Sequence, residues 1–185
     1  MKMKLDLHTH CFEALYVPWP KGITPVMVGK IVASVKAKGL DGIAVTEHYR
    51  KEFGFMAKDI VCEHFNNQVV IIPGQEIYLH RIHVVELFLP DGTIFRFIPH
   101  PVYLDYLENN FDFSQIHGIE IDNHYYSQYM DKPKIEAIAE KHCLLLLSNS
   151  DAHDLSDIGY YHNKIDLNEL QTRVQVHAEG KVDTY

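Results

Sequence analysis

Short apolar runs of strand length alternate with longer amphipathic stretches along most of this chain. Most of the short runs are apolar throughout, which is typical of strands buried on both faces of a parallel sheet. Pro90-Asp91-Gly92 indicates a turn, so the two runs beside it should form an antiparallel hairpin. The predicted strands are Lys4–Leu7, Gly42–Thr46, Val69–Ile72, Val84–Leu89, Ile94–Ile98, Gly118–Ile121 and Leu144–Leu147.

Four of the longer stretches indicate helices. In the clearest one, Thr24 is a suitable N-cap, Pro25 suits the first helical position and Gly39 suits the C-terminal stop. Its apolar residues recur with the helical period. The predicted helices are Pro25–Lys38, Ala57–Phe65, Pro133–His142 and Asp166–His177.

Repeated strand–helix units imply right-handed crossovers and a sheet covered by helices. The 185 residues contain no internal repeat and no low-complexity linker, and this length suits one ordinary domain. We therefore predict an α/β fold in which residues 1–185 form a single domain, a small (β/α) barrel that is open or distorted. In such barrels the chemistry lies at the C-terminal ends of the strands.

The first predicted strand ends in His8-Thr9-His10, and the alternation of side chains along a strand places the two imidazoles on the same side. Imidazole is the commonest metal-ligating side chain, although one such pair is a weak signal. Histidines and carboxylates also accompany the later strands, which predicts a metal site at one end of the barrel. These residues are Glu13, Glu47, His48, Glu76, His83, His100, Asp122, His124, Asp151 and His153.

In this order the motifs resemble those of the PHP (polymerase and histidinol phosphatase) superfamily, from residue 5 to about residue 160. They are His8-X-His10, Thr46-Glu47-His48, Gly74-Gln75-Glu76, His83, His100-Pro101, Gly118-Ile119-Glu120-Ile121 and Ser150-Asp151-Ala152-His153. The resemblance implies a distorted (β/α)7 barrel and a small stand-alone metal-dependent phosphoesterase. Such an enzyme hydrolyses a phosphate mono- or diester with a hydroxide that bridges two ions of a di- or trinuclear site.

The resemblance also implies a ligand set and two or three divalent ions, Zn²⁺, Mn²⁺ or Fe²⁺, as cofactors. Glu76 would bridge the first ion to a second ion, which His83 and His100 hold. Mixed imidazole and carboxylate ligands suit these metals. The first ion would be held by His8, His10, Glu76 and Asp151.

A third ion would be held by His48 and His153. The family usually supplies a further His or Asp shortly after His-X-His, and here Glu13 is the obvious substitute. The family also usually has Asp-His where this chain has Glu47-His48. Both differences from the family pattern lie in the motifs that would hold the third ion. Alternatively, His48 and His153 act as acids or bases beside a two-metal site, and with Asp151 they are the candidate catalytic residues.

Several residues near these motifs allow more than one interpretation. Arg50, Lys51 and Arg81 lie near the motifs, and Arg81 and Arg50 are candidates for binding substrate phosphate unless they are simply solvated. Asp6 is expected to orient a ligand imidazole, and Glu47 to lie outside the ligand set. Four tyrosines line a pocket or pack the barrel rim: Tyr125, Tyr126, Tyr160 and Tyr161.

The other histidines and Cys11 are expected to be structural. His124 is the alternative to His100 as a ligand, and the His-Pro context favours His100. Cys11 is expected to be a buried or partly exposed thiol beside the metal motif. Surface or satisfied positions are expected for His64, His80, His117, His142, His162 and His177.

The formal charge of −8 disfavours a general nucleic-acid surface, although bound cations would still attract an anionic substrate locally. The apolar runs are too short to span a bilayer, and the first strand leaves no room for a signal peptide. Three cysteines without a CxxC spacing favour a reducing compartment, so a cytoplasmic location is expected.

The leading hypothesis is therefore a phosphoesterase for a small phosphorylated metabolite or nucleotide. One alternative is a catalytically weak or inactive protein that binds metal or a phosphorylated ligand. Another is an exonuclease-type module, for which nucleic acid would serve only as a short oligonucleotide substrate. No membrane partner is expected, and the oligomeric state stays open.

Overall fold

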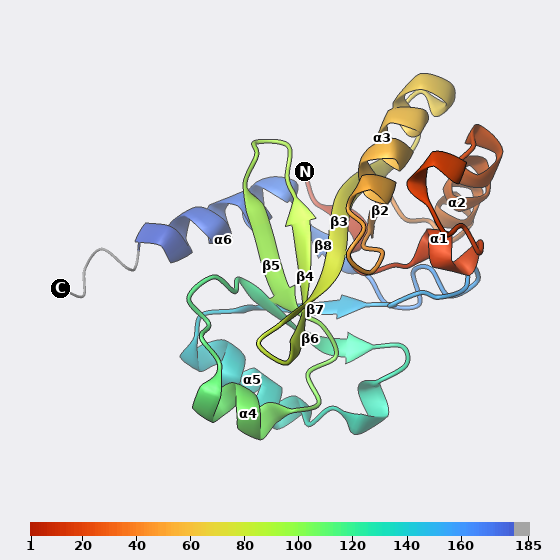
Figure 1. The fold of residues 1–185 in the computed structure, drawn as a ribbon. Helices are drawn as coiled ribbons and strands as arrows, with labels where there is room; N and C mark the ends of the chain where they lie inside the picture. The colour runs from red at the N-terminus through yellow and green to blue at the C-terminus, as the bar shows by residue number, and fades with distance from the viewer. Residues whose placement is uncertain (180–185) are drawn as a thin grey trace.

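Continuously apolar segments form the strands of one curved sheet in the computed structural model. The structure describes the backbone of residues 1–179 and the side chains of residues 1–176, so the side chain of His177 lies outside the described residues. Figure 1 shows the strands curving into a nearly closed barrel with the order β7-β6-β5-β4-β3-β2-β1-β8. Their bounds are β1 (Met3–Asp6), β2 (Gly42–Val45), β3 (Val70–Leu79), β4 (Ile82–Phe88), β5 (Ile94–Ile98), β6 (Gly118–Asn123), β7 (Leu145–Asn149) and β8 (Asn163–Ile165).

The helices cover this sheet from several sides. Helices α2 and α3 lie together on one side of the barrel, and α4 and α5 lie together on another (Figure 1). The side chain of Thr24 accepts a hydrogen bond from the Met27 N–H and caps α2, as expected. The bounds are α1 (Cys11–Ala14), α2 (Pro25–Ala37), α3 (Glu52–Phe65), α4 (Leu104–Asn110), α5 (Lys132–Lys141) and α6 (Leu167–Glu179).

The predicted single-domain α/β barrel is confirmed, with differences in its details. Strands β1–β2–β3 and β5–β6–β7 are parallel, whereas β4 is antiparallel to both of its neighbours. A tight turn therefore joins β3 to β4 in place of a helix, and both strands extend beyond their predicted bounds. The turn residues His80 and Arg81 have positive φ angles of 46° and 69°.

Five short elements were not predicted: α1, α4, β8 and the two 3-10 helices η1 (Pro20–Gly22) and η2 (Ser127–Tyr129). An element of three to seven residues completes too little of a helical or strand period to stand out in the sequence. Helix α3 also begins five residues earlier than predicted, because its first turn contains Phe53 and Gly54 and lacks a recognisable cap. The sheet consequently has eight strands, one more than expected.

A side chain joins the two edges of the sheet. Strands β7 and β8 lie at opposite ends of the strand order. The Asn163 amide accepts from the Ser148 N–H at 2.9 Å and donates to the Ser148 carbonyl at 3.0 Å. It also donates to Asn149 Oδ1 at 2.8 Å. Asn163 thus supplies the hydrogen bonds that a further ladder would otherwise make along this seam.

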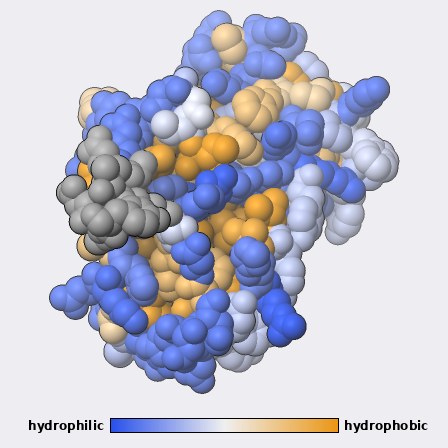
Figure 2. Space-filling view, turned by 60° about the vertical axis from the view of Figure 1, so that its left-hand side comes forward, coloured by the Kyte–Doolittle hydropathy of each residue, from blue (hydrophilic) through white to orange (hydrophobic). Residues whose placement is uncertain are grey.

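The surface in Figure 2 is mostly hydrophilic, with apolar residues confined to patches between the polar ones. Apolar patches of this kind are ordinary on a folded domain. Among the described helices, none combines the length and the apolar character needed to cross a bilayer.

Candidate metal centre

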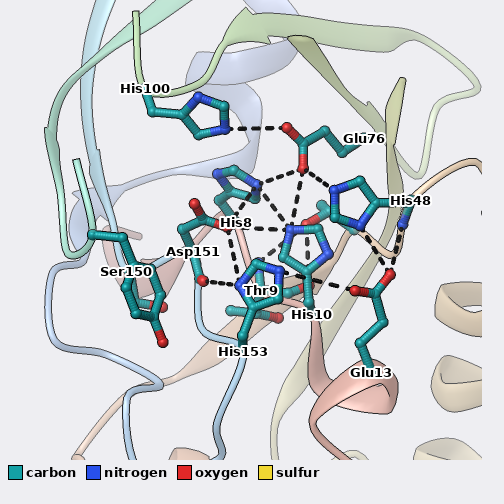
Figure 3. A network of polar contacts seen from close by, with 12 residues as sticks. His8, Thr9, His10, Glu13, His48, Glu76, His100, Ser150, Asp151 and His153 are labelled. Carbon is teal, nitrogen blue, oxygen red and sulfur yellow. Dashed lines mark hydrogen bonds and ion pairs between the residues drawn. The ribbon is translucent and has the colours of Figure 1, made fainter. Parts of the chain in front are cut away.

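Four side chains from three segments that are far apart in the sequence meet at one end of the barrel (Figure 3). His8 and His10 follow β1, Glu76 lies in β3, and Asp151 follows β7. His10 Nε2 lies 3.2 Å from both Glu76 Oε2 and Asp151 Oδ1, and His8 Nε2 lies 3.4 Å from the same two oxygens. All four side chains are buried. Two imidazole nitrogens and two carboxylate oxygens therefore converge on one point.

The donor set fits a divalent cation. Asp151 Oδ1 is buried and makes no hydrogen bond within the described structure, although it faces the imidazoles of His8 and His10. A buried carboxylate oxygen without a hydrogen bond is costly unless a cation compensates it. Nitrogen and carboxylate oxygen donors without thiolates suit zinc, manganese or iron.

Glu76 lies at the middle of the centre and contacts five histidines. Its Oε2 faces His8, His10 and His48, the last at 3.2 Å. Its Oε1 lies 2.5 Å from His83 Nδ1 and 3.2 Å from His100 Nε2. Burial alone would raise the pKa of Glu76, but hydrogen bonds from the histidines hold that pKa well below its usual range. Each oxygen of the ionised Glu76 carboxylate thus faces its own set of histidines.

A third group surrounds the ring of His10. Glu13 Oε1 lies 2.9 Å from His48 Nδ1, and Glu13 Oε2 lies 3.9 Å from His153 Nε2. The rings of His48 and His153 both stack near His10, with centroids 4.4 and 4.3 Å from its own and 6.1 Å from each other. The hydrogen bond from His48 lowers the pKa of Glu13 to about 2, and the same contact raises the pKa of His48 to about 10. The structure therefore brings Glu13 together with His48 and His153.

Glu47 explains how Glu13 reaches this position. The Glu47 carboxylate accepts hydrogen bonds from the N–H groups of Phe12 at 2.7 Å and Glu13 at 3.2 Å. It thereby satisfies the free N–H groups in the first turn of α1. Burial raises the pKa of Glu47 to about 7. Glu47 does not belong to any of the three groups of possible metal-binding residues in the described part of the chain.

The structure distinguishes between His100 and His124 as candidate metal ligands. His100 faces Glu76, whereas the ring of His124 packs on Tyr160 at 3.9 Å and on Tyr125 at 4.8 Å. His100 has a φ angle of 29°, and Asp151 has one of 57°. Positive φ angles at such residues are strained and tend to occur at functional sites.

The expectation that Asp6 orients a ligand imidazole is wrong. Its carboxylate accepts hydrogen bonds from the hydroxyl and the N–H of Ser150, at 2.5 and 3.1 Å, and from the Gly159 N–H at 2.8 Å. Among the described residues, the hydrogen bond that Asp6 makes to a histidine comes from the backbone N–H of His8 and not from an imidazole. These donors occupy the carboxylate, so Asp6 instead holds the loop that leads into Asp151. Burial raises the pKa of Asp6 to about 6.

The residue that orients His8 is Glu120, which belongs to the motif Gly118-Ile119-Glu120-Ile121 but had no role predicted for its side chain. Glu120 Oε1 lies 3.0 Å from His8 Nδ1 and accepts from Asn149 at 2.8 Å. Its Oε2 accepts from the His100 N–H at 2.8 Å and from Asn123 at 2.9 Å. Glu120 is fully buried. A single carboxylate within an otherwise apolar strand was the signal that could have identified it.

The candidate phosphate-binding cations occupy different surroundings. Arg81 lines a cavity together with His83 and His100. The Arg50 guanidinium donates to the Pro18 carbonyl and lies 4.9 Å from the centre of the Trp19 ring. Arg50 is therefore engaged with its own loop.

The remaining candidates lie outside the three groups of possible ligands. Cys11 is buried, and Thr9 Oγ1 lies 3.2 Å from its sulfur. Tyr126 packs against His100 with ring centroids 4.5 Å apart. Tyr125 donates to Asp157, and Tyr160 packs against Tyr161. None of the three groups includes His64, His80, His117, His142 or His162.

Comparison with known proteins shows what this fold is similar to. No family model matches the chain, and no curated protein matches it. PsfC from Pseudomonas syringae PB-5123 superposes with a TM-score of 0.57 and 15% identity, over 97% of this chain and 99% of PsfC. A protein from Bifidobacterium adolescentis, provisionally described as a metal-dependent phosphoesterase, superposes with a TM-score of 0.65 and 11% identity, over 91% of this chain and 96% of that protein. At these identities the likeness establishes the fold alone.

Proposed function

We propose that this protein is a PHP-type, metal-dependent phosphoesterase that hydrolyses a mono- or diester of a small phosphorylated metabolite or nucleotide. The observation that carries the proposal is the position of Glu76, whose two carboxylate oxygens face two separate sets of histidines. The fold shared with a protein provisionally described as a metal-dependent phosphoesterase supports it.

Two or three divalent ions, Zn²⁺, Mn²⁺ or Fe²⁺, would be bound by the three groups of residues. The first ion would be held by the four buried residues that include Asp151, and a second by Glu76 and His83, which form a possible metal-binding group with His48. His100 belongs to none of the three groups, but its Nε2 lies 3.2 Å from Glu76 Oε1, and we propose that it completes the second set. Glu13, His48 and His153 would hold a third. When bound, such ions lower the pKa of an attacking water and withdraw charge from the phosphoryl oxygens.

His153 has the tautomer needed to handle a proton. Its Nδ1 lies 2.8 Å from the Asp151 carbonyl oxygen, which can only accept, so Nδ1 carries the hydrogen. Burial lowers the pKa of His153, which favours the neutral ring. Its Nε2 therefore offers a lone pair, either to an ion or to a proton.

With only two ions bound, His153 would act as the base. Its Nε2 would take a proton from the attacking water while the water oxygen bonds to phosphorus and the ester P–O bond breaks. The same proton then passes to the leaving alkoxide, which departs as an alcohol, and inorganic phosphate is the other product of monoester hydrolysis. His48 is the alternative proton donor to the leaving group, since Glu13 keeps the pKa of His48 at about 10.

Arg81 is the better candidate to contact the substrate phosphate. It lines the cavity beside His83 and His100, and it makes no ion pair with another described residue. Arg50 is held by Pro18 and Trp19. A guanidinium near the centre would add to the attraction of the cations for an anionic ester.

The natural partner would be a small phosphorylated substrate, with nucleic acid limited to nucleotides or short oligonucleotides. The three cysteines are free, which supports the proposal of a reducing, cytoplasmic location.

The test is a phosphoesterase assay with Mn²⁺, Zn²⁺ or Fe²⁺ on wild type, Asp151→Ala and Asp154→Ala. Asp154 is a matched control because it lies in the same loop and its carboxylate accepts from the neighbouring Ser156, outside the candidate metal centre. We expect Asp151→Ala and chelation to abolish hydrolysis and Asp154→Ala to retain it. Hydrolysis that survives both Asp151→Ala and chelation would refute the proposal. Metal binding without hydrolysis of a broad phosphoester panel would support the non-catalytic alternative.

A further inference from the structure

A cavity of about 230 Å³ opens directly beside the candidate metal centre. His83 and His100, the two histidines that face Glu76 Oε1, form part of its wall. A group attached to a phosphate at the centre can therefore reach the cavity without crossing the protein surface. The cavity is not needed to hold the ions, so it requires a separate explanation.

The cavity has aromatic walls, an apolar floor and no acidic residue. Ile98 and Leu107 are buried at its floor. Tyr78, Tyr103 and Tyr126 line it although they are 54%, 66% and 38% exposed. Exposed aromatic side chains gathered around one apolar hollow are typical of a ligand site. No Asp or Glu in the described part of the chain lines the cavity, so no described carboxylate there would pair with a cationic group.

We propose that this cavity binds an uncharged ring carried by the alcohol part of the ester, which makes phosphate esters of ring-bearing alcohols the preferred substrates. This inference rests on the proposed phosphoesterase function and deepens it. An apolar cavity of about 150 Å³ can hold benzene in another protein, so the space here suits one ring and its linking carbon. The flat faces of the tyrosines would stack on such a ring.

The experiment compares kcat/KM for benzyl phosphate and ethyl phosphate with the metal-loaded protein. Both are esters of primary alcohols, so the ratio reports the ring and not the ease of breaking the bond. We expect wild type to prefer benzyl phosphate by roughly 30-fold, the gain from burying a phenyl-sized group. Val102→Phe, which would fill the cavity, and Tyr103→Ala, which removes one wall, should move the ratio toward one.

Tyr16→Ala is the matched control. Tyr16 is 92% exposed and lines a different hollow, beside Glu13 and His48. The wild-type ratio should persist in this variant. A wild-type ratio near one, an unchanged ratio in both cavity variants, or an equal loss in Tyr16→Ala would overturn the inference.

A binding measurement separates this inference from the proposed function. If ethyl phosphate is hydrolysed but benzyl phosphate is not preferred, the function stands and the ring site fails. If the broad phosphoester panel, with these two esters included, is not hydrolysed, the function fails, and titration calorimetry with benzylphosphonate and ethylphosphonate still tests the cavity. Benzylphosphonate should then bind about 30-fold more tightly. Equal affinities, or no binding of benzylphosphonate, would overturn the inference.

Discussion

Replacing Glu120 with glutamine should weaken metal binding although Glu120 would touch no ion itself. The carboxylate accepts from four donors: His8 Nδ1, Asn149 Nδ2, the His100 N–H and Asn123 Nδ2. The glutamine amide has only one acceptor oxygen, so its NH₂ group must face two of these donors. Glu120→Gln therefore loses two hydrogen bonds and the negative charge that keeps His8 correctly oriented.

The magnitude follows from the role of such partners. Loss of a partner that orients a metal-ligating histidine typically lowers metal affinity by about 10- to 100-fold. Since each bond to a charged group contributes about 1.5–3 kcal/mol, the loss of two bonds should also make the metal-free variant unfold more easily, by roughly 3–6 kcal/mol. Both effects arise from one buried side chain, which is 0% exposed.

The assay is a zinc titration in competition with a chelating dye, followed by urea unfolding of the metal-free protein. Glu86→Gln is the matched control: Glu86 is a buried glutamate in β4, its carboxylate accepts from Gln75 and Arg96, and it belongs to none of the possible metal-binding groups among the described residues. Wild-type zinc affinity in Glu120→Gln, or an equal loss of affinity in Glu86→Gln, would refute the reasoning.

Three further predictions concern the whole protein. Chelation should lower the melting temperature, because ions at about 100 times their Kd contribute about 2.7 kcal/mol of stability; an unchanged melting temperature would count against resident metal. In the metal-free protein, the lowered pKa of Glu13 stabilises the folded state above pH 4.5, and this effect is lost as the pH falls toward 2. The raised pKa of His48 stabilises the folded state below pH 6.5, and this effect is lost as the pH rises through about 10. The stability difference between wild type and Glu13→Gln should therefore be largest between pH 4.5 and 6.5, at less than about 1 kcal/mol because both groups are over a third exposed; a difference that grows above pH 7 would contradict this pairing. Asn163→Leu should destabilise the barrel by roughly 1–3 kcal/mol, because it leaves the Ser148 N–H and carbonyl at the seam without their partner, and urea unfolding that matches wild type would show that the seam is held otherwise.

Features that depend on neighbours in the chain could be predicted from the sequence. The run Gly42–Val45 is buried at every position, as a parallel strand requires. Thr24, Pro25 and the apolar spacing defined α2 to within one residue at its C-terminal end. His8 and His10 could be placed at a strand end for the same local reason, and the order of the motifs suggested that Glu76 and Asp151 would join them.

Contacts between distant segments were decided by the closure of the barrel. Glu120 lies 112 residues from His8, and nothing in the local pattern of either segment connects them. Asp6 lies two residues before His8, so strand alternation places both side chains on the same side. The Asp6 carboxylate nevertheless accepts hydrogen bonds from the N–H and the hydroxyl of Ser150. A local period specifies which residues are buried together in one element. Which carboxylate meets which imidazole depends on strand order, register and loop conformation, and only the tertiary structure determines these.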